Sequence, residues 1–183
     1  EYGLIYHKHY LREMMKRPFI AGSSLWNLND FYSESRIDAV PHVNNKGIVG
    51  LDREVKDTYL FYKAALIRRP MLTIGNREWK ARGGMVNTVQ NECIQSVPVF
   101  SNAKEVELMI NNKSLGTKKI EDGYALFDVP FVNGENQLEA LAIIDDQKLR
   151  DLFTVQFQLI GSQLKDKTTP FTEMNVMLGS PRY

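Results

Sequence analysis

The sequence has a single cysteine, no long apolar run and almost no net charge, and each shortage excludes a class of protein. Its 183 residues include only Cys93, so no disulfide can form within the chain. No apolar stretch approaches the length of a membrane-spanning helix, and no membrane association is expected. With a formal net charge of +1 and no basic stripe interleaved with aromatic rings, the sequence gives no sign of nucleic-acid binding.

Sites for metals and common cofactors are also missing. His7 and His9 stand two positions apart, so a helix would point them to different sides, and we identify no metal site. Neither a nucleophile with its base nor a glycine-rich phosphate loop is present, and no cofactor is expected. Cys93 flanks a strand-like run and is interpreted as a small buried apolar residue. The composition that remains, 43% hydrophobic and 25% charged, is typical of a folded protein.

The first part of the sequence follows a helical period. Apolar and aromatic residues over Tyr2–Lys16 predict a helix that Pro18 ends. The apolar run PFIAGSSLW, residues 18–26, predicts a buried strand. A second helix is predicted with Asp52 as its N-cap and Pro70 beyond its end. Its apolar stripe consists of Val55, Tyr59, Tyr62 and Leu66.

After Pro70 the helical period gives way to short runs rich in β-branched and aromatic residues. The runs are MLTIG, IQSVPVFS, EVELMINN, YALFDVPFV, NQLEALAII and LFTVQFQLI. Turn signals separate them at Asn111-Asn112, Asp122-Gly123, Asn133-Gly134 and Asp145-Asp146. Regularly spaced short strands of this kind predict a mainly β fold, an immunoglobulin-like antiparallel sandwich over residues 71–161. Residues 162–183 have the composition of a linker followed by the start of a further domain.

A long connection without periodicity joins the predicted strand to the second helix. Connections as long as Asn27–Asn45 are uncommon inside compact domains and are often functional. If the strand belongs to a (β/α)8 barrel, its C-terminal end lies on the face where such barrels hold their active sites. The candidate residues on this face are Trp26, Asn27, Asp30, His42, Asn44 and Lys46.

Each candidate also has a purely structural interpretation. Trp26 could fill a core, or its ring could pack on the CH-rich face of a sugar. Asn27 and Asp30 could close the loop by bonding local backbone. Lys46 could be a solvated turn charge, and His42 a loop histidine. The sequence offers no pair of carboxyl groups suited to glycoside hydrolysis, so no catalytic residue is expected in this chain.

Two stretches, RPFIAGSSLWNLNDF and VNNKGIVGLDREVKDTYLFYKA, resemble glycoside hydrolase family 2, the β-galactosidase and β-glucuronidase family. The resemblance implies that residues 1–70 are the last strand and helix of a catalytic (β/α)8 barrel. VPVFSNAKEVELMINNKSLG and VPFVNGENQLEALA resemble the immunoglobulin-like domain that follows the barrel in many bacterial members. PFTEMNVMLGS resembles the entry into another accessory domain.

The opening Glu1-Tyr2-Gly3 matches the family's nucleophile motif in letters only. A helical stripe follows Glu1 directly, which leaves no room for the loop that the motif requires, so we assign Glu1 to the helix. The resemblance therefore implies a fragment of a retaining exo-β-glycosidase that is inactive alone, from a periplasmic or secreted bacterial parent. We expect Trp26 to wall the sugar subsite, and Asn44 and Lys46 to bond sugar hydroxyls or a carboxylate.

The sequence is compatible with two alternatives, one for the parent enzyme and one for the role of the sandwich. Overall similarity favours a β-galactosidase-like parent, with a β-glucuronidase next. The sandwich could instead be a carbohydrate-binding or structural module, although the alternation of its strands predicts that most of its rings face the core. These rings are Trp79, Tyr124, Phe127 and Phe131. A barrel strand without neighbours should also leave groups unpaired, so we expect self-association through residues 18–28.

Overall fold

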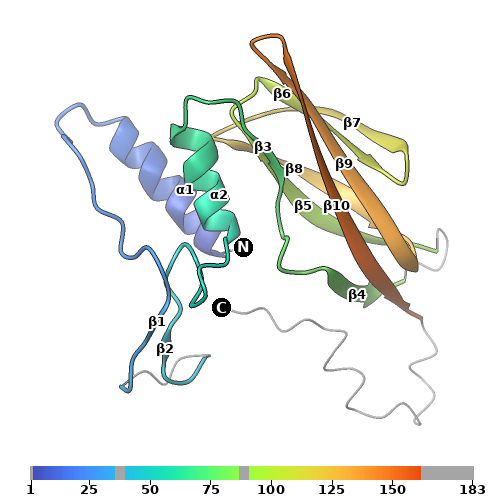
Figure 1. The fold of residues 1–183 in the computed structure, drawn as a ribbon, viewed down its shortest axis with the longest axis horizontal. Coiled ribbons are helices and arrows are strands. Elements are labelled where there is room, and N and C mark those ends of the chain that lie inside the picture. The colour runs from blue at the N-terminus through green and yellow to red at the C-terminus, as the bar shows by residue number, and fades with distance from the viewer. Residues whose placement is uncertain (1, 36–39, 87–90, 162–183) are drawn as a thin grey trace.

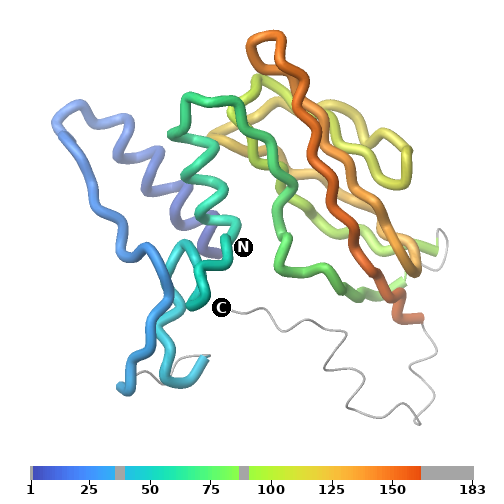
Figure 2. Tube along the Cα trace, viewed as in Figure 1, coloured from blue at the N-terminus to red at the C-terminus, as the bar shows by residue number. Residues whose placement is uncertain are grey.

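The computed structural model describes residues 2–35, 40–86 and 91–161, and it divides into a helical layer and a β-sandwich (Figure 1). The predictions about Glu1 and about residues 162–183 lie outside the described residues. Helix α1, Tyr2–Met15, and helix α2, Asp57–Leu66, lie side by side, as both views show (Figure 2). No helix in the described ranges is both long and apolar enough to cross a membrane.

Helix α1 matches its prediction, whereas α2 corrects one. The N-cap predicted at Asp52 is wrong, because α2 begins at Asp57. Asp52 lies in a turn in which the Gly50 N–H donates to the Glu54 carbonyl at 2.9 Å, and Arg53 has a φ of 65°. That left-handed conformation does not occur within an α-helix. The buried face of α2 is also shifted from the predicted stripe and consists of Leu60, Phe61 and Ala64, while Val55 and Leu66 are exposed.

The predicted buried strand over residues 18–26 is not present. This segment begins with a turn at Pro18 and Phe19 and belongs to no strand, and Phe19 and Trp26 are 80% and 73% exposed. A strand needs a neighbour to receive its backbone hydrogen bonds. No described segment pairs with residues 18–26, so the apolar run has no sheet to enter. Two short strands follow instead, β1 at Phe31–Tyr32 and β2 at Val43–Asn44, paired antiparallel.

The sandwich has the predicted immunoglobulin-like architecture, with two sheets facing each other. One sheet has the strand order β4-β10-β9-β6-β7 and the other β3-β5-β8. The strands are β3 Leu72–Ile74, β4 Ala81–Met85, β5 Cys93–Ser101, β6 Glu105–Ile110, β7 Lys113–Lys119, β8 Tyr124–Phe131, β9 Gly134–Ile144 and β10 Gln147–Ile160. All named pairs are antiparallel except β4 with β10.

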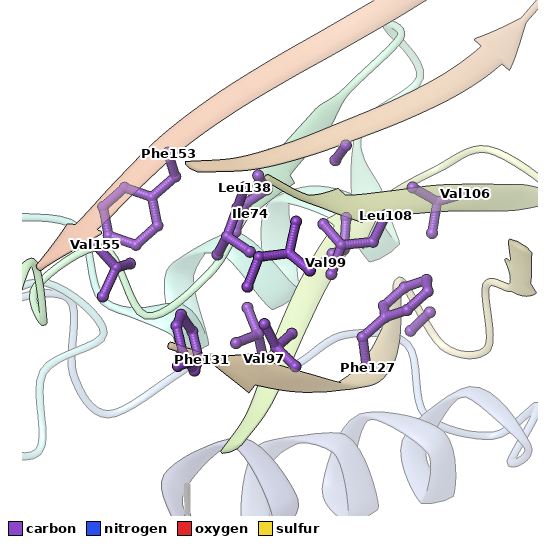
Figure 3. Packing of buried hydrophobic residues seen from close by; sticks show 14 of the residues in the cluster. Ile74, Val97, Val99, Val106, Leu108, Phe127, Phe131, Leu138, Phe153 and Val155 are labelled. Carbon is purple, nitrogen blue, oxygen red and sulfur yellow. The ribbon is translucent and has the colours of Figure 1, made fainter. Parts of the chain in front are cut away.

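Alternating side chains from both sheets form one core (Figure 3). In β6 the inward residues Val106, Leu108 and Ile110 are at most 4% exposed, as their alternation with Glu105, Glu107 and Met109 predicts. The opposite sheet contributes the rest of the facing layer, with Val97, Val99, Phe127 and Phe131 at its centre. Interdigitation of two inner faces is the usual way in which such a sandwich excludes water.

Tight turns connect the long strands and fix their register. Both residues of Asn111-Asn112 and of Asp145-Asp146 have positive φ, between 48° and 65°. Two consecutive left-handed residues are typical of the two-residue hairpin whose twist matches its strands, and asparagine and aspartate tolerate this conformation best after glycine. These turn predictions are therefore confirmed.

The rings and the cysteine of the sandwich behave largely as predicted. Phe127 and Phe131 are buried, Tyr124 is partly buried, and Trp79 is 38% exposed. Cys93 is partly buried and packs against the core, and burial raises the pKa of its thiol. A raised pKa keeps the thiol protonated and unreactive, which agrees with its interpretation as a small apolar residue.

A second apolar cluster joins the helical layer to the sandwich. Phe61 of α2 is fully buried and meets Tyr124 edge to face, with ring centroids 6.4 Å apart. Met71 and Phe100 complete the cluster together with Leu60. The Asn102 side chain then fixes the connecting segment: its oxygen accepts from the Met71 N–H at 2.9 Å, and its amide donates to the carbonyls of Ile67 and Arg69. The end of α2 is therefore held firmly on the sandwich.

Candidate functional site

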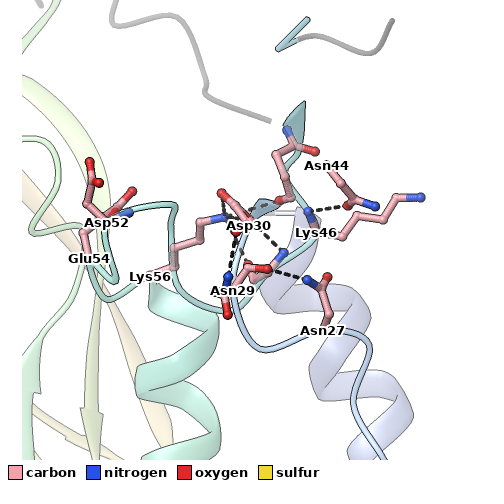
Figure 4. Close-up of polar contacts among 10 residues, drawn as sticks. Asn27, Asn29, Asp30, Asn44, Lys46, Asp52, Glu54 and Lys56 are labelled. Carbon is pink, nitrogen blue, oxygen red and sulfur yellow. Dashed lines mark hydrogen bonds and ion pairs between the residues drawn. The ribbon is translucent and has the colours of Figure 1, made fainter. Parts of the chain in front are cut away.

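The segment after Trp26 and the segment after Asn44 run side by side. The Ile48 N–H donates to the Asn27 carbonyl at 3.2 Å, and the Val49 N–H donates to the Leu28 carbonyl at 2.9 Å. In return the Asp30 N–H donates to the Val49 carbonyl at 3.0 Å. These bonds bring together four of the residues that the sequence predicts for the site, from two segments about twenty residues apart (Figure 4). The four residues are Asn27, Asp30, Asn44 and Lys46.

Gly47 allows this close approach. A Cβ at this position would lie 2.3 Å from the backbone nitrogen of Asp30 and 2.4 Å from the carbonyl carbon of Asn29. Neither atom belongs to a side chain that could move aside, so only glycine fits. The turn Asn44–Gly47 is thereby pressed against the Asn27–Asp30 segment.

A partly buried ion pair lies next to the turn (Figure 4). The Lys56 Nζ donates to both carboxylate oxygens of Asp30, at 2.8 and 2.7 Å. The same Nζ donates to the carbonyls of Asn45 and Gly47, at 3.3 and 3.0 Å. Asp30, which is only 8% exposed, also accepts the Gly47 N–H at 2.8 Å. With its charge and both of its oxygens engaged, this carboxylate closes the loop and is unsuited to act as a general acid.

Asn44 and Lys46 form the outer part of the turn. Asn44, at the end of β2, is 3% exposed, and its side-chain oxygen accepts the Lys46 N–H at 3.2 Å. The Lys46 side chain is exposed and extends away from the Asp30–Lys56 ion pair (Figure 4). Within the described ranges it forms no ion pair. The turn thus exposes the Lys46 ammonium group, and hydrogen bonds fix the backbone on both sides of Lys46.

Asn27 lies at the inner edge of this arrangement. Its Nδ2 donates to the Asn29 carbonyl, and the Asn29 Nδ2 donates to the Asp30 carbonyl at 2.8 Å. The Asn27 Oδ1 is buried and has no hydrogen-bond partner among the described residues. A buried acceptor without a partner is uncommon and can serve a ligand hydroxyl.

Trp26 and His42 lie at the margins. The Trp26 ring is 73% exposed and meets Phe31 edge to face, with ring centroids 6.4 Å apart. It therefore fills no core in this structure. His42 is exposed, has a φ of 60° and lies 3.8 Å from the carboxylate of Glu34. His42 contacts Glu34 and the backbone. These contacts do not include the Asp30–Lys56 ion pair.

Lys56 and Gly47 are the site residues whose roles the sequence did not reveal. Lys56 occupies the N-cap position of α2, with extended backbone and no capping hydrogen bond. A cation is unfavourable at a helix N-terminus, where the helix dipole is positive. A lysine directly before a helix is therefore a signal that its charge has another partner, and this signal could have found the ion pair.

A cavity in the described part of the chain lies away from these residues. It has a volume of about 460 Å³ and is lined by α1, the end of α2 and the sandwich. Leu11, Phe61 and Ala64 form its apolar wall, and Lys8 and Arg12 share the carboxylate of Asp122 at its rim. No group of three or more potential metal ligands occurs in the described ranges.

Comparison with known proteins points to one group of enzymes. Residues 94–150 match the family model described as a domain of unknown function, DUF4982. The chain is 31% identical to a β-glucuronidase of Bacteroides fragilis over 159 residues, which cover 84% of this chain and 21% of that protein. The chain therefore spans about a fifth of the length of this relative.

Solved structures support the same conclusion. The crystal structure of a β-glucuronidase from Bacteroides uniformis superposes with a TM-score of 0.81 and 36% identity, over 86% of this chain and 19% of that one. A putative β-galactosidase from Bacteroides fragilis superposes with a TM-score of 0.66 and 25% identity, over 85% and 22%. Both names denote glycoside hydrolases, and the immunoglobulin-like sandwich belongs to a fold found in such enzymes.

Proposed function

We propose that this chain is part of a retaining exo-β-glycosidase and contributes one wall of its sugar subsite. Residues 1–70 are the closing segment of its catalytic barrel, 71–161 its immunoglobulin-like domain and 162–183 the entry into a further domain. The chain itself supplies no nucleophile or acid/base residue. Both carboxylates of the reaction come from other parts of the whole enzyme.

The observation that carries this proposal is the fixed turn Asn44–Gly47 beside Trp26. The turn exposes the Lys46 ammonium group with the buried Asn44 amide beside it, and an exposed indole ring lies one residue before the segment that the turn packs on. An aromatic plane suits the CH-rich face of a pyranose. An ammonium group and an amide suit a carboxylate, because hydrogen bonds to a charged group are stronger than those between neutral groups.

We further propose that the sugar is a β-glucuronide. Overall resemblance in sequence favours a β-galactoside, but β-glucuronidases predominate among the named relatives, and the first solved structure at 36% identity is also one. The β-glucuronidase alternative is therefore the better supported of the two. Lys46 and Asn44 would then bind the carboxylate at C6 of the sugar.

The test is kinetic and uses the full-length enzyme that contains this chain. Replacing Lys46 with Met should raise the KM for 4-nitrophenyl β-D-glucuronide about 10- to 100-fold, the usual effect of losing one charged hydrogen bond. Activity on 4-nitrophenyl β-D-galactoside should not fall. Lys63→Met is the matched control, because Lys63 is an exposed lysine on α2. A Lys46→Met enzyme with unchanged glucuronide kinetics would refute the proposed substrate.

The isolated chain provides a second test. Residues 1–183 should not hydrolyse 4-nitrophenyl β-galactoside or β-glucuronide above a buffer blank, because the carboxyl pair is missing. Measurable turnover would mean that Glu1 acts in catalysis and would overturn its assignment to a helix.

A different class of function, a carbohydrate-binding sandwich, is less well supported. Such modules present exposed rings to their ligand, whereas Phe127 and Phe131 are at most 1% exposed and Tyr124 packs against α2. Calorimetric titration of the chain with glucuronic acid oligosaccharides should show no heat assignable to residues 71–161. The sandwich instead braces α2 through the apolar cluster around Phe61.

A further inference from the structure

We propose that Lys56 is a positioning residue for substrate selectivity: it holds the Lys46 ammonium group in place without itself touching the sugar. This inference rests on the proposed function, since it assumes that Lys46 binds the sugar carboxylate. It adds a residue outside the turn whose role follows from hydrogen bonds in the structure.

Lys56 bonds the backbone on either side of Lys46. The two backbone carbonyls that accept from Lys56 Nζ belong to Asn45 and Gly47, at 3.3 and 3.0 Å. These residues immediately precede and follow Lys46 in the chain. The peptide unit before Lys46 and the peptide unit after Gly47 are thus both bonded to the Lys56 ammonium group, while the unit between Lys46 and Gly47 donates its N–H to Asp30. A shift of the Lys46 backbone would break at least one of these hydrogen bonds.

The partner of Lys56 is the second argument. Asp30 neutralises the charge of the Lys56 ammonium group, and the Asp30 Oδ1 also accepts the Gly47 N–H. The side chains of this ion pair are 24% and 10% exposed. Hydrogen bonds to charged groups in such shielded sites hold their geometry more strongly than exposed ones. Both partners of the ion pair therefore bond the same short stretch of backbone.

The partners of the Lys56 side chain distinguish a role in positioning the turn from a general role in protein stability. Lys56 stands at the start of α2, yet its side chain bonds the turn, whereas the residues that fasten α2 to the sandwich lie further along the helix at Leu60, Phe61 and Ala64. Loss of the Lys56 side chain should loosen the turn and leave the apolar cluster intact. A displaced ammonium group penalises a sugar that carries a carboxylate more than a neutral sugar.

The kinetic experiment compares Lys56→Met, Lys46→Met and the control Lys63→Met in the full-length enzyme. We expect Lys56→Met to raise the KM for 4-nitrophenyl β-D-glucuronide about 10-fold with kcat changed less than about 3-fold, since small displacements of a binding group cost this much or more. The KM for the β-galactoside should stay within about 2-fold, on the same reasoning. Lys56→Arg, which keeps the charge, should recover part of the loss.

Hydrogen exchange on the isolated chain reads the same contact without activity. The Gly47 amide donates to Asp30 and should be protected in the native protein. In Lys56→Met its exchange should accelerate at least about 10-fold, while the amides of α2 and the sandwich remain unchanged. Lys63→Met should leave the Gly47 amide protected.

The possible outcomes distinguish the two proposals. If Lys46→Met impairs glucuronide binding and Lys56→Met leaves it unchanged, the positioning role is wrong and the proposed substrate stands. If Lys46→Met has no effect on glucuronide binding, the proposed substrate fails and the positioning role fails with it. Equal losses in Lys56→Met on both sugars, with a lowered melting temperature, would show a general structural role and also overturn the inference.

Discussion

The sandwich and the segment before it handle their apolar residues in opposite ways. Among the described residues, all of the large side chains that are almost fully buried lie in the sandwich, with the exception of Phe61. Helix α1, by contrast, has no buried residue, and Tyr2, Ile5 and Met15 on it are more than 60% exposed. The same chain therefore contains one region with a large continuous core and one that buries little apolar surface, at the joint with the sandwich and at Val43, Ile48 and Val49.

The difference shows where each region obtains its stability. The sandwich has two facing sheets and excludes water without help, because each inner face covers the other. The helical layer packs one face of α2 on the sandwich through Phe61, and in the described ranges much of its remaining apolar surface has no partner. This difference predicts that substitutions in the sandwich core lower the free energy of unfolding strongly, whereas substitutions of the exposed residues Phe19, Trp26 and Leu28 change it little.

The largest expected effect is loss of the sandwich core in Phe131→Ala. Phe131 is fully buried and stacks on Phe157, with ring centroids 4.9 Å apart. Its removal leaves a cavity and should cost about 3–5 kcal/mol of unfolding free energy. Leu126→Ala on the same strand is the control: Leu126 is 48% exposed, and its loss should cost less than about 0.5 kcal/mol. Urea denaturation measures both, and similar losses in the two variants would contradict the account.

A smaller effect is expected at the joint, in Phe61→Ala. Phe61 is fully buried but lies beside the cavity of about 460 Å³, so neighbouring groups and water can partly fill the space it leaves. We expect the free energy of unfolding to fall by about 3 kcal/mol, the lower end of the range for this substitution. The loss should appear as early unfolding of α1 and α2 in hydrogen exchange, with the sandwich amides still protected. Simultaneous loss of both regions would show that the joint is required for the sandwich.

The third prediction concerns pH and the partly buried carboxylate of Asp57 at the start of α2. Burial, the largest cause, raises the pKa of Asp57 to about 6 from its usual 3.8, although a hydrogen bond from the Asn76 N–H at 2.8 Å lowers it. Since the folded pKa is the higher one, the folded state binds the proton first as pH falls. Stability from this group is therefore greatest below about pH 4, declines between pH 4 and 6, and is lowest above that range.

Replacing Asp57 with Asn removes this penalty at neutral pH. The shift of about two pKa units sets an upper limit of ~3 kcal/mol. The favourable position of a carboxylate at a helix N-terminus offsets up to about 1 kcal/mol of that. We expect Asp57→Asn to be stabilised by about 1–2 kcal/mol at pH 8, and to equal the parent chain at pH 3.5, in thermal melts at both values. A variant that is less stable at pH 8 would show that the ionised carboxylate is favourable.

The sandwich was predictable because its strands satisfy their own pattern. Alternation in residues 105–110 places Val106, Leu108 and Ile110 inward, and turn pairs such as Asn111-Asn112 mark where each hairpin closes. Two strands were missed, β4 with the sequence ARGGM and β7 with KSLGTKK. Both lie at sheet edges, where backbone hydrogen bonds to one neighbour hold a segment whose composition has little preference for a strand.

Outside the sandwich the sequence was less informative, for a physical reason. The run of residues 18–26 has the composition of a buried strand, but burial depends on neighbours that the described ranges do not include. At the candidate site, residue types indicated Asn44, Lys46 and Asp30. The pairing of Asp30 with Lys56 joins positions 26 residues apart. No local pattern encodes such a contact, although an uncapped lysine at a helix start hints at it.

The smallest expected effect tests the incomplete region directly. Phe19, Trp26 and Leu28 expose apolar side chains on a segment whose backbone has few partners. An exposed segment of this kind is a template for pairing with another chain, so the isolated protein should self-associate weakly. Light scattering should show a mass that rises with concentration.

Phe19→Asp should lower that mass and change the free energy of unfolding by less than about 0.5 kcal/mol, because Phe19 packs on nothing that folding requires. Lys63→Asp, an exposed charge change on α2, should leave the association unaltered. A chain that stays monomeric at millimolar concentration would mean that the segment tolerates water by itself, and the contrast with the sandwich would then reflect composition rather than a missing partner.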